Sequence, residues 1–457
     1  MTKSEDKNLG INLTQGNIPG LILKFFIPFL LANLLNGLYN TVDTVIIGQY
    51  LGSSGIVSTA TAGRILQLFT YVAVALASGG QTVISQLIGA GKYDELNETI
   101  GTMLTELVAM AAVFGAACAF LASDIIAWLN TPAESFEGAR QYLVITSCGL
   151  PLVFGYNAVS SILRGMGDSR RPLVFIAIAT GVNVAGDIVL VWAFGLGVAG
   201  TAIATVGAQG IAFICSLVYL YVKREKFGFD FKLRSFAVKW DKLKVMLRIG
   251  LPMALREVLL VSAKLVITGY MNLYNPVEIA AYNICDKFYS FSNIFAFSTK
   301  QAAGTMVAQN IGAGKKERVK LIVRDTLIMN MVAAGVLCTL AFVIPKPIFG
   351  IFTSEADVIA YAPLYMMIEC ITFVFSGLGG PYDSVVVGTG NSGLGFLTGI
   401  VDGVILRVGL GILLGIVADM GVVGFFLSDG LARVGSTAIV AIYYYSGAWK
   451  SRKKLIE

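Results

Sequence analysis

The chain has 457 residues, of which 56% are hydrophobic and 14% are charged, with a formal net charge of +6. Soluble domains carry about 25% charged residues, so this composition excludes an ordinary soluble protein and favours a membrane protein. The sequence contains no histidine, and its six cysteines lie apart in apolar stretches without metal-ligand spacing. Any proton chemistry is therefore expected at carboxylates, because the usual proton shuttle is missing.

Twelve apolar stretches follow one another along the chain, separated by Gly and Pro breaks, and each is long enough for a membrane-spanning helix of about 20 residues. They are long and unalternating, unlike the strands of a transmembrane barrel. We therefore predict an all-α polytopic membrane protein with twelve transmembrane helices. The predicted spans are 21–48, 57–88, 95–121, 138–162, 172–194, 198–222, 247–273, 277–309, 320–344, 355–383, 393–417 and 421–446.

Several sequence landmarks occur twice at nearly the same offset. The string Ile-Gly-Ala-Gly-Lys stands at 88–92 and again at 311–315, and Gly197-Val-Ala-Gly200 returns as Gly421-Val-Val-Gly424. A fixed offset indicates an internal repeat of six helices, and an even number of helices preserves direction through the membrane. We expect two pseudo-symmetric six-helix lobes. The predicted domains are an N-lobe at 1–222, a basic cytoplasmic linker at 223–246 and a C-lobe at 247–457.

Lys and Arg residues concentrate in alternate loops, most densely in the 223–246 linker and the 450–454 tail. The positive-inside rule then predicts a multi-pass protein of the cytoplasmic membrane with both termini in the cytoplasm. The linker is expected to lie along anionic membrane lipids. Topology accounts for the positive net charge, so no nucleic-acid partner is expected.

The first predicted helix carries Asn33, Asn36, Asn40 and Asp43 at steps of three and four, which puts all four on one face. An ionisable residue inside a membrane helix costs roughly 2.5–3.5 kcal/mol on the insertion scale, so Asp43 indicates function. Asn stripes also hold helices together. For the three Asn residues, packing and function stay equally open.

The fifth predicted helix carries Asn183 and Asp187 on one face, and the sixth carries Thr201 and Thr205. We expect these groups to meet Asp43 in one small site. Two carboxylates in an apolar pocket cannot both stay ionised. The pair is expected to hold a proton, or to exchange it for a sodium ion bound by Asp43, Asp187 and Asn183.

The second half carries different charges at the corresponding positions. Lys264 corresponds to Asp43, and Arg407 corresponds to Asn183. Glu257 and Lys264 lie seven residues apart on one helix face, where a structural ion pair is the alternative to a functional role. Asp429 and Arg433, at i and i+4, are predicted to pair with each other, and a role for Asp402 with Arg407 stays open.

Polar and aromatic side chains on several predicted helices are candidates to line a cavity. An aromatic wall with carboxylates suits hydrophobic organic cations. The candidate cavity residues are Asn33, Asn36, Asn40, Tyr39, Lys264, Asn283, Lys300 and Glu369.

Taken together, several motifs resemble the multidrug and toxic compound extrusion (MATE) family, within the wider flippase-like transporter superfamily. The resemblance covers nearly the whole chain. The matching motifs are Leu38–Gly48 around Asp43, Gln86–Lys92, Leu163–Asp168, Asn183–Asp187, Gly197–Thr205, Gly250–Pro252 with Glu257, Gln309–Lys315, and Asp383 with Gly388 and Gly390.

The resemblance implies a V-shaped cavity between two lobes and antiport of amphipathic organic cations or drugs against H⁺ or Na⁺ by alternating access. It implies no enzymatic activity, no cofactor and a monomer. A family cation site matches Asp43, Asn183, Asp187 and Thr205, and an acidic pair of some members matches Glu257 and Asp383. Because the chain has both sets, the choice between H⁺ and Na⁺ stays open.

Two rival interpretations remain. Lys264, Lys300 and Arg407 keep open a flippase for a lipid-linked or amphipathic anionic metabolite. A polytopic enzyme or a receptor is disfavoured, because the sequence shows no metal constellation and no nucleophile–base pair, and because it is a repeat.

Overall fold

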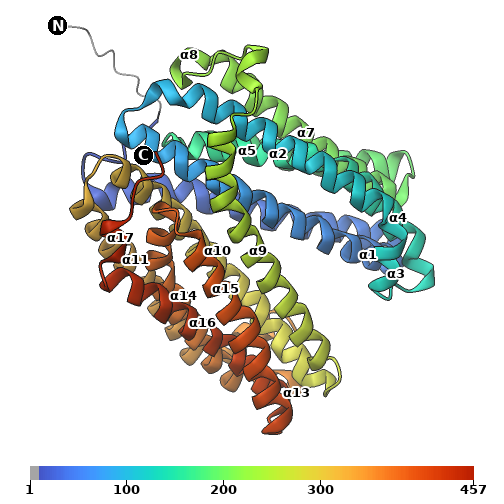
Figure 1. Ribbon diagram of the computed structural model, residues 1–457. Helices are drawn as coiled ribbons and strands as arrows, with labels where there is room; N and C mark the ends of the chain where they lie inside the picture. The colour runs from blue at the N-terminus through green and yellow to red at the C-terminus, as the bar shows by residue number, and fades with distance from the viewer. Residues whose placement is uncertain (1–9, 457) are drawn as a thin grey trace, which may run out of the picture. The chain divides into compact units, whose positions relative to one another are not determined.

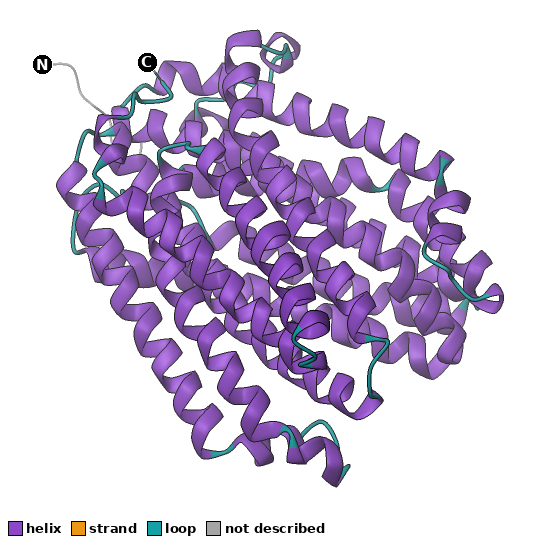
Figure 2. Cartoon of the chain, turned by 60° about the horizontal axis from the view of Figure 1, so that its bottom comes forward, coloured by secondary structure: helices purple, strands orange, loops and turns teal. Residues whose placement is uncertain are grey.

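The computed structural model describes residues 10–456, in which every regular element is a helix and no strand occurs (Figure 2). Residues 1–9 of the predicted N-lobe and residue 457 of the predicted C-lobe lie outside this part. Helix contacts divide the chain into two compact units. Unit 1 comprises residues 10–12 with Ile27–Ala254, and unit 2 comprises Leu13–Phe26 with residues 255–456.

Two breaks shape the helices of the first half (Figure 1). The 73-residue helix α1 is kinked at Gly52, whose φ of 66° is left-handed, so it supplies two of the predicted spans. Helices α4 and α5 are bent by 47° about Gly149 and together make one span. The elements are α1 (Ile18–Ala90), η1 (Tyr93–Glu95), α2 (Leu96–Phe120), α3 (Ala122–Trp128), α4 (Ala133–Cys148), α5 (Leu150–Gly165), α6 (Arg170–Asp187), η2 (Ile188–Ala193) and α7 (Gly197–Val222).

The basic segment after α7 is folded onto unit 1. It contains the short helices α8 (Arg224–Phe227) and η3 (Leu233–Phe236). The Thr105 hydroxyl of α2 donates to the Phe236 carbonyl at 2.8 Å, and the Lys239 amide donates to the Thr102 hydroxyl at 3.1 Å. Helix α9 begins at Trp240 rather than at residue 247, so the connection is shorter than the sequence indicates.

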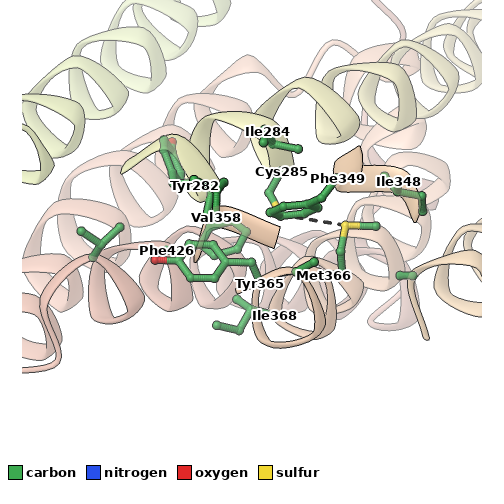
Figure 3. Packing of buried hydrophobic residues seen from close by; sticks show 14 of the residues in the cluster. Tyr282, Ile284, Cys285, Ile348, Phe349, Val358, Tyr365, Met366, Ile368 and Phe426 are labelled. Carbon is green, nitrogen blue, oxygen red and sulfur yellow. Dashed lines mark hydrogen bonds between the residues drawn. The ribbon is translucent and has the colours of Figure 1, made fainter. Parts of the chain in front are cut away.

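Helix α14 is the centre of unit 2, where it packs against α10, α11 and α16 (Figure 1). Its aromatic residues enter the main apolar core, in which the rings of Tyr365 and Phe426 stack with centroids 5.3 Å apart (Figure 3). The elements are α9 (Trp240–Met271), α10 (Pro276–Gly312), α11 (Lys316–Val343), α12 (Pro345–Gly350), α13 (Ala356–Ala360), α14 (Ala362–Gly388), α15 (Ser392–Gly399), η4 (Ile400–Leu410), η5 (Leu413–Val417), α16 (Gly421–Tyr445) and α17 (Ala448–Ser451).

The helices account for the predicted membrane spans. Within the described residues, eight helices are long and apolar enough to cross a membrane, and the bent pair α4–α5 makes a ninth. The kinked α1 counts twice. The remaining two are α9 and α10, with 32 and 37 residues, which are long enough to span but carry several charged side chains.

The duplicated Ile-Gly-Ala-Gly-Lys string forms the same helix end in both halves. Gly91 and Gly314 each have a φ of 72°. The Lys92 amide donates to the Leu87 carbonyl at 3.0 Å, and the Lys315 amide donates to Asn310 at 2.8 Å. This left-handed cap satisfies carbonyls at the end of the helix. The repeated pentapeptide therefore forms the same turn in both halves.

We expect Gly91→Ala and Gly314→Ala each to destabilise the protein, because a side chain in the left-handed region costs about 1–2 kcal/mol. The measurement is the midpoint of unfolding in detergent. Gly335→Ala is the matched control: Gly335 lies inside α11, and a Cβ there meets nothing within 4 Å. An equal or higher midpoint for both turn variants would contradict the assignment.

Candidate functional site

Two carboxyl groups meet inside unit 1. Asp43 comes from α1 and Asp187 from the end of α6, and their side chains are in hydrogen-bond contact. Asp187 is 0% exposed. Each carboxyl keeps its Oδ1 atom buried without a hydrogen-bond partner. Two carboxyl groups can hydrogen-bond to each other only when one of them carries a proton.

Asn183 and Thr205 complete the site from α6 and α7. The Asn183 amide nitrogen donates to Asp187 Oδ2 at 3.1 Å, and its oxygen accepts from the Thr205 backbone amide at 3.3 Å. The Tyr39 hydroxyl donates to the Thr205 hydroxyl at 3.3 Å. The predicted residues Asp43, Asn183, Asp187 and Thr205 therefore do lie together, and the amide presents a donor to the acidic pair.

Tyr142 of α4 is a member of this site that the sequence did not indicate. It hydrogen-bonds with Thr205 and acts electrostatically with Asp43 and Asp187. Its ring packs in an apolar cluster with residues such as Cys118 of α2. Thr146 lies one helical turn from Tyr142, but no pattern in the sequence linked this helix to the acidic pair.

No Lys or Arg among the described residues neutralises the acidic pair; the groups that act on it are carboxyl and tyrosine side chains. The predicted Asn stripe lies along α1. Asn40 is exposed and donates to the Asn36 carbonyl at 2.9 Å, while Asn36 and Asn33 are half-buried on the same helix.

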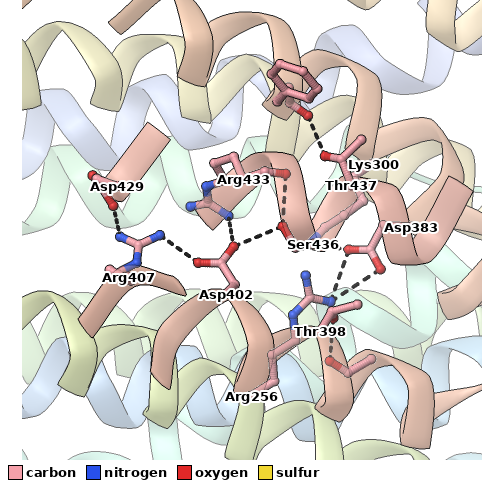
Figure 4. A network of polar contacts seen from close by, with 12 residues as sticks. Arg256, Lys300, Asp383, Thr398, Asp402, Arg407, Asp429, Arg433, Ser436 and Thr437 are labelled. Carbon is pink, nitrogen blue, oxygen red and sulfur yellow. Dashed lines mark hydrogen bonds and ion pairs between the residues drawn. The ribbon is translucent and has the colours of Figure 1, made fainter. Parts of the chain in front are cut away.

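The corresponding part of unit 2 is an ion-pair network (Figure 4). Asp383 of α14 pairs with Arg256 of α9 at 3.1 Å and with Lys300 of α10 at 3.5 Å. The structure brings Arg256, rather than the predicted Glu257, to Asp383. Glu257 is half-buried and acts on Arg256 at longer range. Asp383 therefore already has two cations within reach.

Lys264 pairs with Asp286 of α10. The alternative of an ion pair between Lys264 and Glu257 is therefore wrong, because residues seven apart on one helix are too distant. The Lys264 ammonium also lies 5.8 Å from the Tyr289 ring centre. Asp286 was missed because the contact joins two helices.

A second predicted pair is also wrong. Asp429 pairs with Arg407, and Arg433 pairs with Asp402 at 3.4 Å, so Asp429 and Arg433 do not pair with each other. Asp402 and Arg407 themselves pair at 2.9 Å. They lie on the π-helix η4, where residues five apart share a face, and this spacing is invisible to a helical pattern of three and four.

Two other predicted cavity residues lie elsewhere. Glu369 is 2% exposed beside the apolar core, with its Oε1 atom unpartnered, and Asn283 is exposed. Unit 2 does contain a cavity of about 90 Å³. Lys300 and Asp383 are the predicted residues on its wall, which also includes Arg256, Ser376 and Arg433.

The MatE family model matches the chain twice, over residues 28–189 and 252–413. The chain belongs to the MatE family. Both matches start and end 224 positions apart, as the repeat predicts. This is a family of transporters rather than enzymes, and the MatE chain is a multi-pass membrane protein.

Among curated relatives, the MatE chain is similar to the "Probable multidrug resistance protein YpnP" of Bacillus subtilis (strain 168). The two are 27% identical over 446 residues, and the alignment covers 98% of this chain and 99% of the relative. Among solved structures, the fold is similar to that of a MOP superfamily transporter from Pyrococcus furiosus Vc1, which is described as having reverse polarity of its binding pocket. The TM-score is 0.87 at 17% sequence identity, and the match covers 99% of this chain and 100% of that one. An outward-facing multidrug resistance MATE family transporter gives 0.86 at 17% identity over 99% and 100%. The predicted twelve-helix, two-lobe fold is confirmed.

We expect Arg407→Met to destabilise the protein by about 3–5 kcal/mol, because removing one partner leaves buried carboxylates uncompensated. The measurement is the unfolding midpoint in detergent. Arg324→Met is the matched control, because Arg324 is 62% exposed and pairs with its neighbour Asp325. Equal midpoints for the two variants would show that the network contributes nothing to stability.

Proposed function

We propose that this MatE protein exports amphipathic organic cations or drugs in exchange for a coupling cation, H⁺ or Na⁺, by alternating access. Family membership and the printed name of the Bacillus relative support drug export. The observation that carries the coupling is the buried contact of Asp43 with Asp187, which lacks a cationic partner.

The coupling step follows from like-charge repulsion. With one proton bound, Asp43 and Asp187 share a hydrogen bond and hold α1 against α6. When the proton leaves, two carboxylates face each other in a low-dielectric site, where repulsion amounts to several kcal/mol. The two helices then separate, and the protein shifts to the state with lower proton affinity, as coupling by differential affinity requires.

Tyr39, Tyr142 and Thr205 transmit the change to other helices. Their hydrogen bonds join α1, α4 and α7 around the acidic pair. A movement of Asp43 therefore alters the packing of at least three helices of the first half. By contrast, Asp383 already has Arg256 and Lys300, so we assign coupling to the first half and not to Glu257 and Asp383.

The two possible orientations of the Asn183 amide suit different cations. Its amide nitrogen faces Asp187, and its oxygen is engaged with Thr205. A sodium ion binds oxygen ligands, so sodium coupling requires the amide to turn over and release Thr205. We further propose that both termini lie in the cytoplasm, that residues 1–222 and 247–457 form the two moving lobes, and that the protein acts as a monomer.

Purified protein in proteoliposomes is expected to export ethidium when a pH gradient is imposed. Asp43→Asn is expected to lower this efflux by about tenfold or more, because a neutral side chain abolishes a repulsion worth a few kcal/mol. Asp124→Asn is the control, because Asp124 is an exposed carboxylate of the same unit.

Full gradient-driven efflux by Asp43→Asn would overturn coupling at this site. A sodium gradient applied at constant pH separates the two ions. Efflux driven by sodium alone would show that sodium, and not a proton, is the coupling ion at the same site. No ethidium efflux under either gradient would overturn organic-cation export.

Binding alone should also release a proton. In detergent at low buffer strength, adding ethidium to the wild-type protein is expected to acidify the solution, as read by the dye pyranine, because an organic cation and the proton compete for one negative charge. Asp187→Asn should bind ethidium without this signal. Equal acidification by both proteins would place the proton elsewhere.

A further inference from the structure

We propose that the cavity inside unit 2 recognises an anionic head group, such as a carboxylate, sulfonate or phosphate, carried by an amphipathic molecule. The cavity has a volume of about 90 Å³, which is enough for several water molecules or for a small head group. The inference concerns binding, and it holds or fails independently of the coupling cation.

The cavity wall carries three cations and one carboxylate. Arg256, Lys300 and Arg433 line it from three different helices together with Asp383, and Arg433 also pairs with Asp402. The three cationic side chains are only 12%, 20% and 24% exposed. Figure 4 shows these groups within one polar network. Three largely desolvated cations around one small space form a site for an anion.

The Asp383 carboxylate itself occupies the position in which an external anion would bind. It sits against Arg256 Nη1 and Lys300 Nζ. The site has donors to spare, since Arg256 Nε and the Ser376 hydroxyl are buried without partners. Because buried polar groups are normally satisfied, these two donors are available to a ligand.

The lining also contains apolar side chains. Phe297, Phe375 and Val440 contribute to the wall, and the Lys300 ammonium lies 5.4 Å from the Phe297 ring centre. The site thus offers cations and aromatic carbon together. It suits an anion attached to an apolar body, supplied either as a transported solute or as an anionic lipid.

The test uses two xanthene dyes of similar shape, anionic fluorescein and cationic rhodamine 123, bound to purified protein in non-ionic detergent and read by fluorescence anisotropy. Lys300→Gln is expected to weaken fluorescein binding by about tenfold, the effect of losing one charge-assisted contact, and to leave rhodamine binding unchanged. Lys287→Gln is the control, because Lys287 is exposed on the same helix and does not line the cavity.

Asp383→Asn provides the decisive contrast. If Asp383 competes with the ligand, its neutralisation frees two cations, and fluorescein should bind more tightly than to the wild type. A structural role alone predicts weaker binding of both dyes. Thermal unfolding shows whether each variant is folded; should Asp383→Asn fail to fold, Lys300→Gln and its control decide.

Equal fluorescein binding by wild type and folded Lys300→Gln overturns the proposal, even if rhodamine binds and ethidium is exported normally. Phosphatidylglycerol added to the micelles distinguishes the source of the anion, with phosphatidylcholine as the neutral comparison. Displacement of fluorescein by phosphatidylglycerol alone assigns the cavity to a lipid head group. If fluorescein binding still depends on Lys300 and is unchanged by phosphatidylglycerol, the cavity is assigned to a solute.

Discussion

A charge buried in a membrane protein needs a partner, and the two halves of this MatE chain meet that requirement differently. In the first half, Asp43 and Asp187 face each other with amide and hydroxyl groups around them. In the second half, carboxylates such as Asp383 and Asp402 lie against fixed guanidinium and ammonium groups. In the function that we propose, the first arrangement binds a mobile cation, whereas the second contains its own cations.

The two halves differ in their interior charges although their backbone turns are the same. Gly91 and Gly314 form the same left-handed turn with the same hydrogen bond, and the family model matches both halves at one offset. Within that scaffold Arg407 lies 224 positions after Asn183, and Lys264 lies 221 positions after Asp43. The two halves thus share a backbone but differ in their interior charges, which are acidic around Asp43 and paired with cations around Asp383.

The helices were predictable because apolar length and Gly breaks are local properties of the sequence. The predicted spans at 198–222 and 421–446 lie within about a residue of α7 and α16 at each end. The meeting of Asp43 with Asp187 and Asn183 was also predictable, because each lies on a polar face of an otherwise apolar helix.

The remaining contacts were not predictable, because they depend on how distant helices face each other. Arg256 rather than Glu257 reaches Asp383, a difference of one residue around α9 that no pattern fixes. Asp402 and Arg407 pair through a π-helix, and Tyr142 reaches the site from a separate helix, α4. Each of these required three-dimensional packing.

The central claim is that Asp43 and Asp187 hold one proton between them. Infrared difference spectroscopy on the purified protein at neutral pH tests it most directly, because a protonated carboxylic acid has a carbonyl band distinct from that of a carboxylate. The account predicts such a band in the wild type, sensitive to deuterium exchange, that is lost or shifted in both Asp43→Asn and Asp187→Asn. A wild-type spectrum without the band, or a band unchanged in both variants, would contradict it.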